Sequence, residues 1–189
     1  MYRSLEKSRR ALMQPARPAP GEIFPAIEVP KLGGGSLRLG VPSKGYDWQM
    51  IVVYRGKHCP ICTRYLGEIN EVAAALKELS IEVVAVSSDS AARAKDQIGE
   101  VSPDFSVGYG LSIEDMKSLG LYISSPRHGI DVEGPFAEPG LFVVNEDREL
   151  RMVDISNVPF LRPQMPSLVR GLRFMRGMTE PFPANGIYA

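Results

Sequence analysis

The feature that most constrains the fold is a Cys-Pro-Ile-Cys motif, residues 59–62, at the junction of a strand-like run and a helical pattern. The run before it, residues 50–54, is continuously apolar and rich in β-branched side chains, as in a buried strand. Apolar residues then recur at helical spacing, at Tyr65, Leu66, Ile69, Val72, Ala73, Leu76 and Leu79. The motif therefore predicts a strand that leads into a helix beginning at the cysteine pair.

A helix start has a chemical consequence for a cysteine. The first backbone N–H groups of a helix lack intrahelical partners, and the macrodipole places partial positive charge there, which favours thiolate over thiol. Cys59 is therefore the expected nucleophile, and Pro60 suits the first helical position because it has no N–H to leave unpaired. Cys62 lies one turn further along the same face, where its sulfur can meet that of Cys59.

Three basic residues precede the motif, and other uses of the two cysteines have to be weighed. Arg55, Lys57 and His58 can each lower the pKa of Cys59 if the side chain points at the sulfur. Zinc needs about four ligands, and the chain has two cysteines and two histidines, so we expect no metal. A structural disulfide in so short a loop constrains the unfolded chain little. Two buried, unreactive thiols remain an alternative, because free cysteine often behaves as a small apolar residue.

Composition limits the class of partner. Lys+Arg and Asp+Glu number 22 each, so the sequence predicts no general attraction to nucleic acid or to an anionic membrane. A length of 189 residues at 44% hydrophobic suits one domain with an adequate core. No apolar run approaches transmembrane length, and residues 1–10 lack the apolar core of a secretory signal. We therefore expect a cytoplasmic protein.

The pattern along the chain predicts one domain with two extensions: an N-terminal arm with a proline-rich segment at 1–21, the domain at 22–178 and a tail at 179–189. Two alternating runs, 27–29 and 36–39, separated by three glycines, predict a β-hairpin. The expected core elements are a strand at 50–55, a helix at 60–79, a strand at 81–87 and a helix at about 90–98. A less regular insertion, 101–139, holds a short helix with a capping box at 112–115 and a stop at Gly120. Strands at 141–145 and 150–155 and a helix after Ser167 complete the order.

This order of elements around the motif resembles the thioredoxin-like superfamily, and within it the redoxin branch, the alkyl hydroperoxide reductase and thiol-specific antioxidant type of peroxiredoxin-like protein. The resemblance covers about residues 22–155 and is carried by the segments VYRGKHCPIC (53–62), VAVSSD (84–89) and GLFVVN (140–145). It implies an α/β thioredoxin-like fold: a three-layer α/β/α sandwich with a mixed central sheet, an N-terminal β-hairpin extension, and an insertion before the C-terminal β-hairpin.

The resemblance breaks at two positions that matter for peroxide reduction. Typical peroxiredoxins carry Thr or Ser three residues before the reactive cysteine and Arg just before the Gly-Leu-Phe strand, whereas this chain has Gly56 and Pro139 there. Without that hydroxyl and that guanidinium, peroxide reduction is expected to be slower unless Arg55 or Arg127 substitutes. Pro139 instead matches a proline that thioredoxin-like dithiol proteins place beside their cysteine pair, usually with a cis bond. An ordinary loop proline is an equal alternative.

The resemblance implies a thiol-based oxidoreductase that cycles Cys59 and Cys62 between dithiol and disulfide to reduce disulfides or peroxides. Arg55, Lys57, His58, Pro60 and Pro139 are the expected supporting residues. It also implies an external thiol reductant of the thioredoxin or glutathione type, no prosthetic group and no metal, and it allows a homodimer. One alternative is a true thiol peroxidase with Cys59 as the peroxidatic cysteine. An alternative of another class is a non-catalytic redox-sensing or interaction module, in which the pKa of Cys59 would be ordinary.

Overall fold

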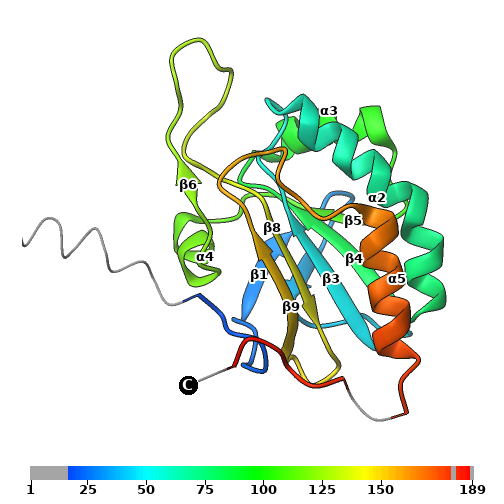
Figure 1. Cartoon of the computed structure of the whole chain (residues 1–189). Coiled ribbons are helices and arrows are strands. Elements are labelled where there is room, and N and C mark those ends of the chain that lie inside the picture. Colours follow the sequence, from blue (N-terminus) through cyan, green and yellow to red (C-terminus); the bar gives the residue numbers. More distant parts are fainter. Residues whose placement is uncertain (1–16, 180–181, 188–189) are drawn as a thin grey trace, which may run out of the picture.

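A mixed five-stranded sheet lies at the centre of the molecule (Figure 1). The structure is a computed structural model, and it describes residues 17–179 and 182–187. The strands follow the order β5-β4-β3-β8-β9, with bounds β3 Trp48–Val53, β4 Ile81–Val86, β5 Ser106–Gly108, β8 Gly140–Val144 and β9 Leu150–Ile155. β4 is parallel to β3 and to β5, whereas β8 is antiparallel to β3 and to β9. The expected α/β fold with a mixed sheet is confirmed.

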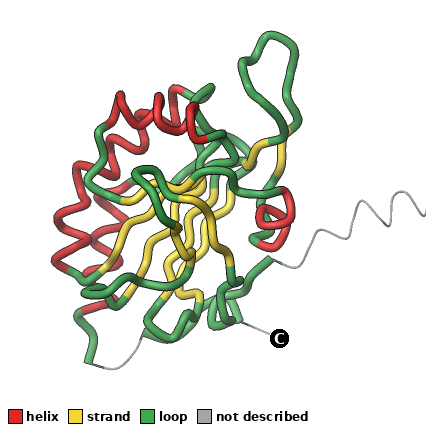
Figure 2. Tube along the Cα trace, turned by 180° about the vertical axis from the view of Figure 1, so that it is seen from behind, coloured by secondary structure: helices red, strands yellow, loops and turns green. Residues whose placement is uncertain are grey.

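Three helices pack on one face of this sheet. Met50 and Val52 of β3 point to this face and pack against Leu66 of helix α2 (Pro60–Glu78) and Leu172 of helix α5 (Met165–Arg176). Helix α3 (Ala91–Val101) lies beside α2 and adds partly buried apolar side chains to the same core. Figure 2 shows these helices gathered on one side of the strands.

The other face is covered by the N-terminal hairpin and by the short helix α4 (Ile113–Ser118). Strand β1 (Ile27–Pro30) pairs antiparallel with β2 (Ser36–Leu39), and the three glycines between them all have positive φ, which a tight turn needs and glycine permits. Ile51 and Val53 of β3 point to this side because side chains alternate along a strand. The predicted hairpin and the predicted capping box at Ser112 and Asp115 are both confirmed.

The insertion before β8 is more ordered than its sequence indicates. Besides α4 it contains β5 and a two-stranded sheet of β6 (Ile123–Ser124) and β7 (Phe136–Ala137). The loop between β6 and β7 projects from the body of the molecule in both views (Figures 1 and 2). Helix α5 begins at Met165, with Pro166 in its first turn, and so starts before the predicted Ser167.

The sheet register brings distant chain segments to the end of β3. Val53 pairs with Gly140, so Glu138 and Pro139 lie beside the residues that follow β3. Val53 also pairs with Val86 of the parallel strand β4, and the segment after β4 therefore lies at the same sheet edge. The cysteine pair sits at this edge, because Cys59 follows β3 and begins α2.

Some expectations are not tested by the described chain. Residues 1–16 of the arm predicted at 1–21 lie outside the described residues, as do 180–181 and 188–189 of the predicted tail. The domain boundaries at 21 and 178 stay a prediction, although the Gly21 N–H already donates to the Leu150 carbonyl at 2.7 Å. Within the described residues, no helix combines the length and the apolar character that crossing a membrane needs.

Candidate active site

The Cys59 sulfur lies at the first turn of α2. Cys59 is the N-cap residue, with extended backbone angles of φ −112° and ψ 95°, and Pro60 occupies the first turn after it. Its sulfur accepts the backbone N–H of Cys62 at 3.3 Å, which satisfies one of the unpaired donors of the helix start. Both cysteines are free thiols; Cys59 exposes 2% of its surface and Cys62 none. The pair is therefore close enough to react and shielded from bulk water.

The surroundings move the pKa values of the two thiols in opposite directions. The side-chain hydrogen bond with Cys62 is the largest cause that lowers the pKa of Cys59, to about 6, against the opposing effect of burial. The Cys62 N–H and the Arg55 guanidinium lower that pKa further. Burial, followed by the hydrogen bond with Cys59, raises the pKa of Cys62. At neutral pH the structure therefore has a Cys59 thiolate and a Cys62 thiol.

Arg55 supplies the positive charge beside Cys59. Its Nη1 lies 3.9 Å from the Cys59 sulfur, and its Nε lies 3.1 Å from Oε2 of the buried Glu138. The guanidinium carbon lies 4.9 Å from the centre of the Phe136 ring, a cation–π arrangement. Ser124 Oγ donates to the second Glu138 oxygen at 2.6 Å. A carboxylate and an aromatic ring thus fix the position of Arg55, and sequence reasoning gave neither of them a role.

The other two expected basic residues, Lys57 and His58, contact groups other than the Cys59 sulfur. Lys57 Nζ pairs with Asp96 Oδ2 at 2.7 Å on the exposed side of α3. The His58 ring packs on the Phe136 ring with centroids 4.4 Å apart, and burial, with Arg55 as the next cause, lowers the pKa of His58. His58 is therefore neutral at pH 7. Arg127, the other expected substitute guanidinium, is exposed in the β6–β7 loop.

Gly56 stands where typical peroxiredoxins carry a hydroxyl residue, and the structure has no room for one. Its φ of +112° is strained for any side chain, and a Cβ would lie 2.5 Å from Asp89 Oδ2. The buried Asp89 carboxylate accepts the Lys57 backbone N–H at 2.7 Å and lies 3.5 Å from Arg93 Nε. The Gly56 carbonyl accepts from Gln97 Nε2 at 3.1 Å. Asp89 and Gln97 hold the turn that leads to Cys59.

Arg162, which sequence reasoning missed, contacts the second cysteine. Its Nη2 lies 2.9 Å from the Cys62 sulfur, and its guanidinium carbon lies 4.7 Å from the centre of the Tyr65 ring. Tyr65 OH in turn donates to the Pro163 carbonyl at 2.9 Å. Arg162 belongs to the irregular segment between β9 and α5, 100 residues from Cys62, and no pattern in that segment indicates its destination.

Pro139 lies at the same edge of the sheet. It lines a small cavity together with Tyr65, Asp154 and Arg162. All peptide bonds among the described residues are trans, so the Glu138–Pro139 bond lacks the cis form that is usual beside a cysteine pair in thioredoxin-like dithiol proteins. Pro139 accepts the Ser156 N–H at 3.0 Å through its carbonyl.

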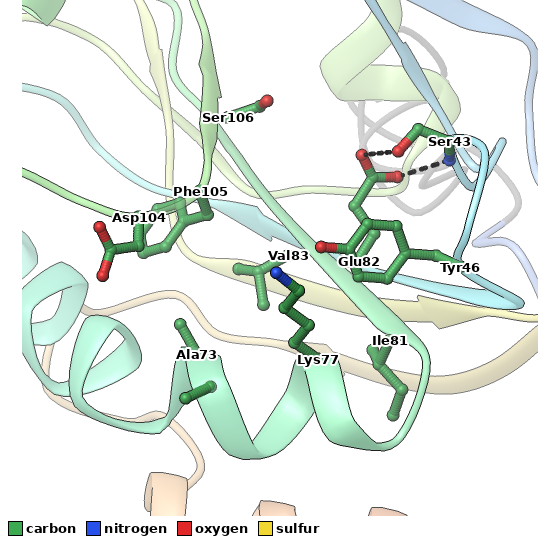
Figure 3. A pocket seen from close by; sticks show the side chains of 11 residues that line it. Ser43, Tyr46, Ala73, Lys77, Ile81, Glu82, Val83, Asp104, Phe105 and Ser106 are labelled. Atoms are coloured by element: carbon green, nitrogen blue, oxygen red, sulfur yellow. Dashed lines mark hydrogen bonds between the residues drawn. The ribbon is translucent and has the colours of Figure 1, made fainter.

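A larger surface hollow lies away from the cysteines. It is formed by α2, the start of β4 and the segment before β5, and Figure 3 shows Lys77, Glu82 and Asp104 around it. The Glu82 carboxylate already accepts from Ser43 N, Ser43 Oγ and Gln49 Nε2. This hollow is at the opposite end of the parallel strands from Cys59, and we assign it no role. In the described part of the chain, no three His, Cys, Asp or Glu residues gather to hold a metal.

Comparison with known proteins gives structural relatives of low sequence identity. A cysteine-to-serine mutant of peroxiredoxin 6 from Arenicola marina superimposes with a TM-score of 0.70 at 17% identity, covering 88% of this chain and 79% of that one. Peroxidoxin BcpB from Mycobacterium tuberculosis gives 0.68 at 17% identity, covering 84% and 99%. A putative thiol:disulfide interchange protein DsbE from Chlorobium tepidum gives 0.62 at 17% identity, covering 84% and 98%. At these identities the likeness establishes the fold.

The family is established by sequence. No curated protein shows a significant sequence match to the chain. The model of the AhpC/TSA family matches residues 20–153, well over half of the chain, and this range contains β3, the cysteine pair and β8. The chain belongs to the AhpC/TSA family, and its function is thiol-based redox chemistry.

Proposed function

We propose that the protein is a thiol–disulfide oxidoreductase in which Cys59 attacks the substrate and Cys62 resolves the product. The observation that carries the proposal is the pairing of a thiolate at a helix start with a buried thiol one turn away, whose own N–H already contacts the first sulfur. An unreactive pair or a non-catalytic module has no need for a Cys59 pKa lowered to about 6. No prosthetic group is needed for this chemistry.

The reaction proceeds by two exchanges. The Cys59 thiolate attacks one sulfur of a disulfide, forms a mixed disulfide, and releases the other sulfur as a thiolate. Cys62 then loses its proton and attacks the Cys59 sulfur; the Cys59–Cys62 bond forms and the second substrate thiolate leaves. The substrate has gained two electrons and the protein has lost two. An external thiol reductant, either one dithiol of the thioredoxin type or two monothiols of the glutathione type, restores the free cysteines, and the proposed cytoplasmic location would supply it.

Thiol peroxidase activity is the second candidate, and the Arg55 guanidinium beside Cys59 favours it. The Cys59 thiolate would attack one peroxide oxygen to give a sulfenic acid and release an alcohol or water, and Cys62 would then form the disulfide and release water. Two features make peroxidase activity the weaker candidate. The position of the usual hydroxyl is Gly56, where a Cβ overlaps Asp89, and the position of the usual arginine is Pro139. A peroxide at Cys59 would therefore have the Arg55 guanidinium beside it but not the hydroxyl that typical peroxiredoxins supply from the position of Gly56.

Burial of the nucleophile affects the size of the substrate. Cys59 exposes 2% of its surface, so side chains around it must move to admit a bulky disulfide, whereas a small disulfide or a peroxide needs less movement. A protein reductant that reacts with Cys59 is part of the proposal. The homodimer that the family resemblance allows is also part of the proposal.

Replacing Cys62 by Ser tests the scheme. The reduced variant should keep a stable Cys59 adduct after brief exposure to a small disulfide, because no second thiol remains to displace it. Intact-mass spectrometry should find one added thiol in Cys62→Ser, an internal disulfide in the wild type, and no adduct in Cys59→Ser. A parallel exposure to hydrogen peroxide separates the two candidates by the rate at which each oxidant consumes Cys59. Wild-type turnover in both single variants would contradict the scheme.

A further inference from the structure

The guanidinium of Arg162, a half-buried residue, has the Cys62 sulfur as its hydrogen-bond partner. Arg162 Nη2 lies 2.9 Å from that sulfur, although a thiol is a weak hydrogen-bond acceptor. The Nε and Nη1 atoms of Arg162 are buried and have no hydrogen-bond partner among the described residues. The face of the guanidinium packs on the Tyr65 ring. Most polar groups in this position would be paired, because an unpaired buried donor is costly.

The charge of Arg162 also lacks a close carboxylate. Among the described residues, no Asp or Glu oxygen lies within ion-pair distance of Arg162. Asp154 lies near enough to feel the charge, and both residues line the small cavity beside Pro139. In the dithiol state the positive charge of Arg162 thus lies beside the neutral Cys62 sulfur. Arg162 gains an anionic hydrogen-bond partner when Cys62 becomes a thiolate.

We infer that Arg162 is a catalytic residue that stabilises the Cys62 thiolate, both when Cys62 attacks and when it leaves. The inference rests on the proposed dithiol function. Each cysteine then has its own guanidinium. Arg55 contacts Cys59, which reacts with the substrate, and Arg162 contacts Cys62, which resolves the adduct.

The two directions of the reaction use the same contact. In resolution, the Cys62 proton passes to the solvent or the departing thiolate, the Cys62 sulfur attacks the Cys59 sulfur of the adduct, and the substrate thiolate leaves. In regeneration, a thiolate of the external reductant attacks the Cys59 sulfur, the Cys59–Cys62 bond breaks, and Cys62 leaves as a thiolate beside Arg162. A guanidinium on Cys62 lowers the barrier in both directions, because the same anion develops in both transition states.

A disulfide that releases a coloured thiol allows the attack by Cys59 and the resolution by Cys62 to be followed in one absorbance time course. Dithiodipyridine is neutral, so loss of a positive charge does not change its attraction to the protein, and it releases one thiopyridone when Cys59 attacks and a second when Cys62 resolves. Arg162→Met keeps much of the side-chain volume and removes the charge. Arg173→Met, on the exposed face of α5, is the matched control for loss of one arginine.

We expect Arg162→Met to leave the first release within about twofold of the wild type and to slow the second by about 10- to 100-fold, the range that a hydrogen bond to a charged group is worth. Arg173→Met should match the wild type in both phases. Arg162→Lys, which restores a charge without the planar fork, should recover part of the second rate. Arg162→Gln should be slow like Arg162→Met, and it serves if the Met variant fails to fold.

The pH profile of the second release distinguishes catalysis from a structural role. The titratable groups that face Cys62 or Arg162 are Cys59, Tyr54, Tyr65 and Asp154. All remain in Arg162→Met, so removal of the guanidinium should move the second-phase profile to higher pH and leave the first-phase profile in place.

The results that would overturn the inference are distinct from failure of the proposed function. A second release at the wild-type rate in Arg162→Met, or equal slowing of both releases, rules out this role for Arg162. A wild-type protein that releases no second thiopyridone overturns the proposed function itself, and this inference with it.

Discussion

At the scale of single residues, the main result is that two identical thiols one turn apart behave as different acids. Cys59 lies at the open end of the helix, where backbone N–H groups and Arg55 stabilise a negative charge. Cys62 lies inside the first turn and exposes none of its surface, so burial favours its neutral form. The difference assigns the attacking and resolving roles before any substrate is considered.

The pKa of Cys59 predicts how its reactivity depends on pH. Because the folded-state pKa is about 6, the rate of alkylation by iodoacetamide should be nearly constant above about pH 7 and fall tenfold per unit below about pH 5. Iodoacetamide is neutral, so the profile follows the thiolate fraction. Arg55→Gln should move the midpoint to higher pH, since the guanidinium is one of the groups that lower the pKa. The measurement is the rate of the first alkylation of a protein that keeps Cys62, read by intact mass, because the raised pKa of Cys62 keeps that residue a thiol.

Two outcomes would contradict the lowered pKa of Cys59 or the part that Arg55 has in lowering it. Alkylation that still rises between about pH 8 and pH 9 would mean an ordinary thiol. A midpoint that Arg55→Gln leaves unchanged would mean that the helix start and Cys62 alone set the acidity.

At the scale of elements, the turn between β3 and α2 is specific to a chain with Gly56. Reinstating the hydroxyl of typical peroxiredoxins by Gly56→Ser should destabilise the reduced protein by about 1–3 kcal/mol, because φ is +112° and the new Cβ meets the Asp89 carboxylate. It should not accelerate peroxide reduction. Urea denaturation and peroxide consumption measure the two effects.

A second glycine provides the control. Gly99 lies exposed on α3, and a Cβ added there would meet nothing within 4 Å beyond its chain neighbours and the nearby backbone of its own helix. Gly99→Ala should therefore be neutral or stabilise the protein by about 0.5–1 kcal/mol. A Gly56→Ser variant as stable as the wild type, with faster peroxide turnover, would show that the turn can adapt to the hydroxyl.

The elements that the sequence predicts well are those with a long apolar pattern. Strand β3, helix α2 and strand β9 are predicted from the apolar pattern alone, with ends that differ by at most two residues from the structure. Strands β5, β6 and β7 have two or three residues each, too few for a pattern to emerge. Helix α5 starts before its predicted residue because Pro166 fits its first turn.

The site residues also divide into those that local sequence predicts and those that only the tertiary structure brings to the site. Cys59 and Arg55 are adjacent to β3 in sequence and could be predicted. Glu138 and Asp89 could have been found from sheet register, because each follows or precedes a strand that pairs with β3. Arg162 lies in an irregular segment whose path depends on tertiary packing, and local sequence has no information on that path.

At the scale of the whole molecule, the site is assembled from four separate parts of the chain. Arg55 to Cys62, Asp89, Glu138 and Arg162 meet at one edge of the sheet only when the sheet is complete. The ionisation of the thiols is therefore linked to global folding.

This linkage predicts a maximum in the stability of the reduced protein. Between about pH 6 and the unfolded thiol pKa of about 8.5, the unfolded state holds a Cys59 proton that the folded state has lost, so stability rises with pH. Above that range the folded state keeps a Cys62 proton that the unfolded state has lost, so stability falls. His58 and Asp154 are present in both the reduced and the oxidised protein, so their contributions to the pH dependence of stability cancel in a comparison of the two forms. The difference in unfolding midpoint between reduced and oxidised protein, measured against pH, isolates the thiols.

A flat difference curve would contradict the linkage. A curve that only rises would mean that Cys62 titrates in the folded protein as it does in the unfolded chain.

The Cys59 thiolate has one further consequence, which concerns electrophoresis. The side chains of the chain sum to a formal charge of zero, so the reduced protein carries about one negative charge near pH 7 once Cys59 is ionised, and closing the Cys59–Cys62 bond removes it. The two redox forms consequently have different isoelectric points although their masses differ by two hydrogens. Oxidation leaves the Arg55 guanidinium beside a Cys59 sulfur that no longer carries a charge, so an anionic reductant approaches an oxidised protein that is more positive by about one charge than the reduced protein it produces.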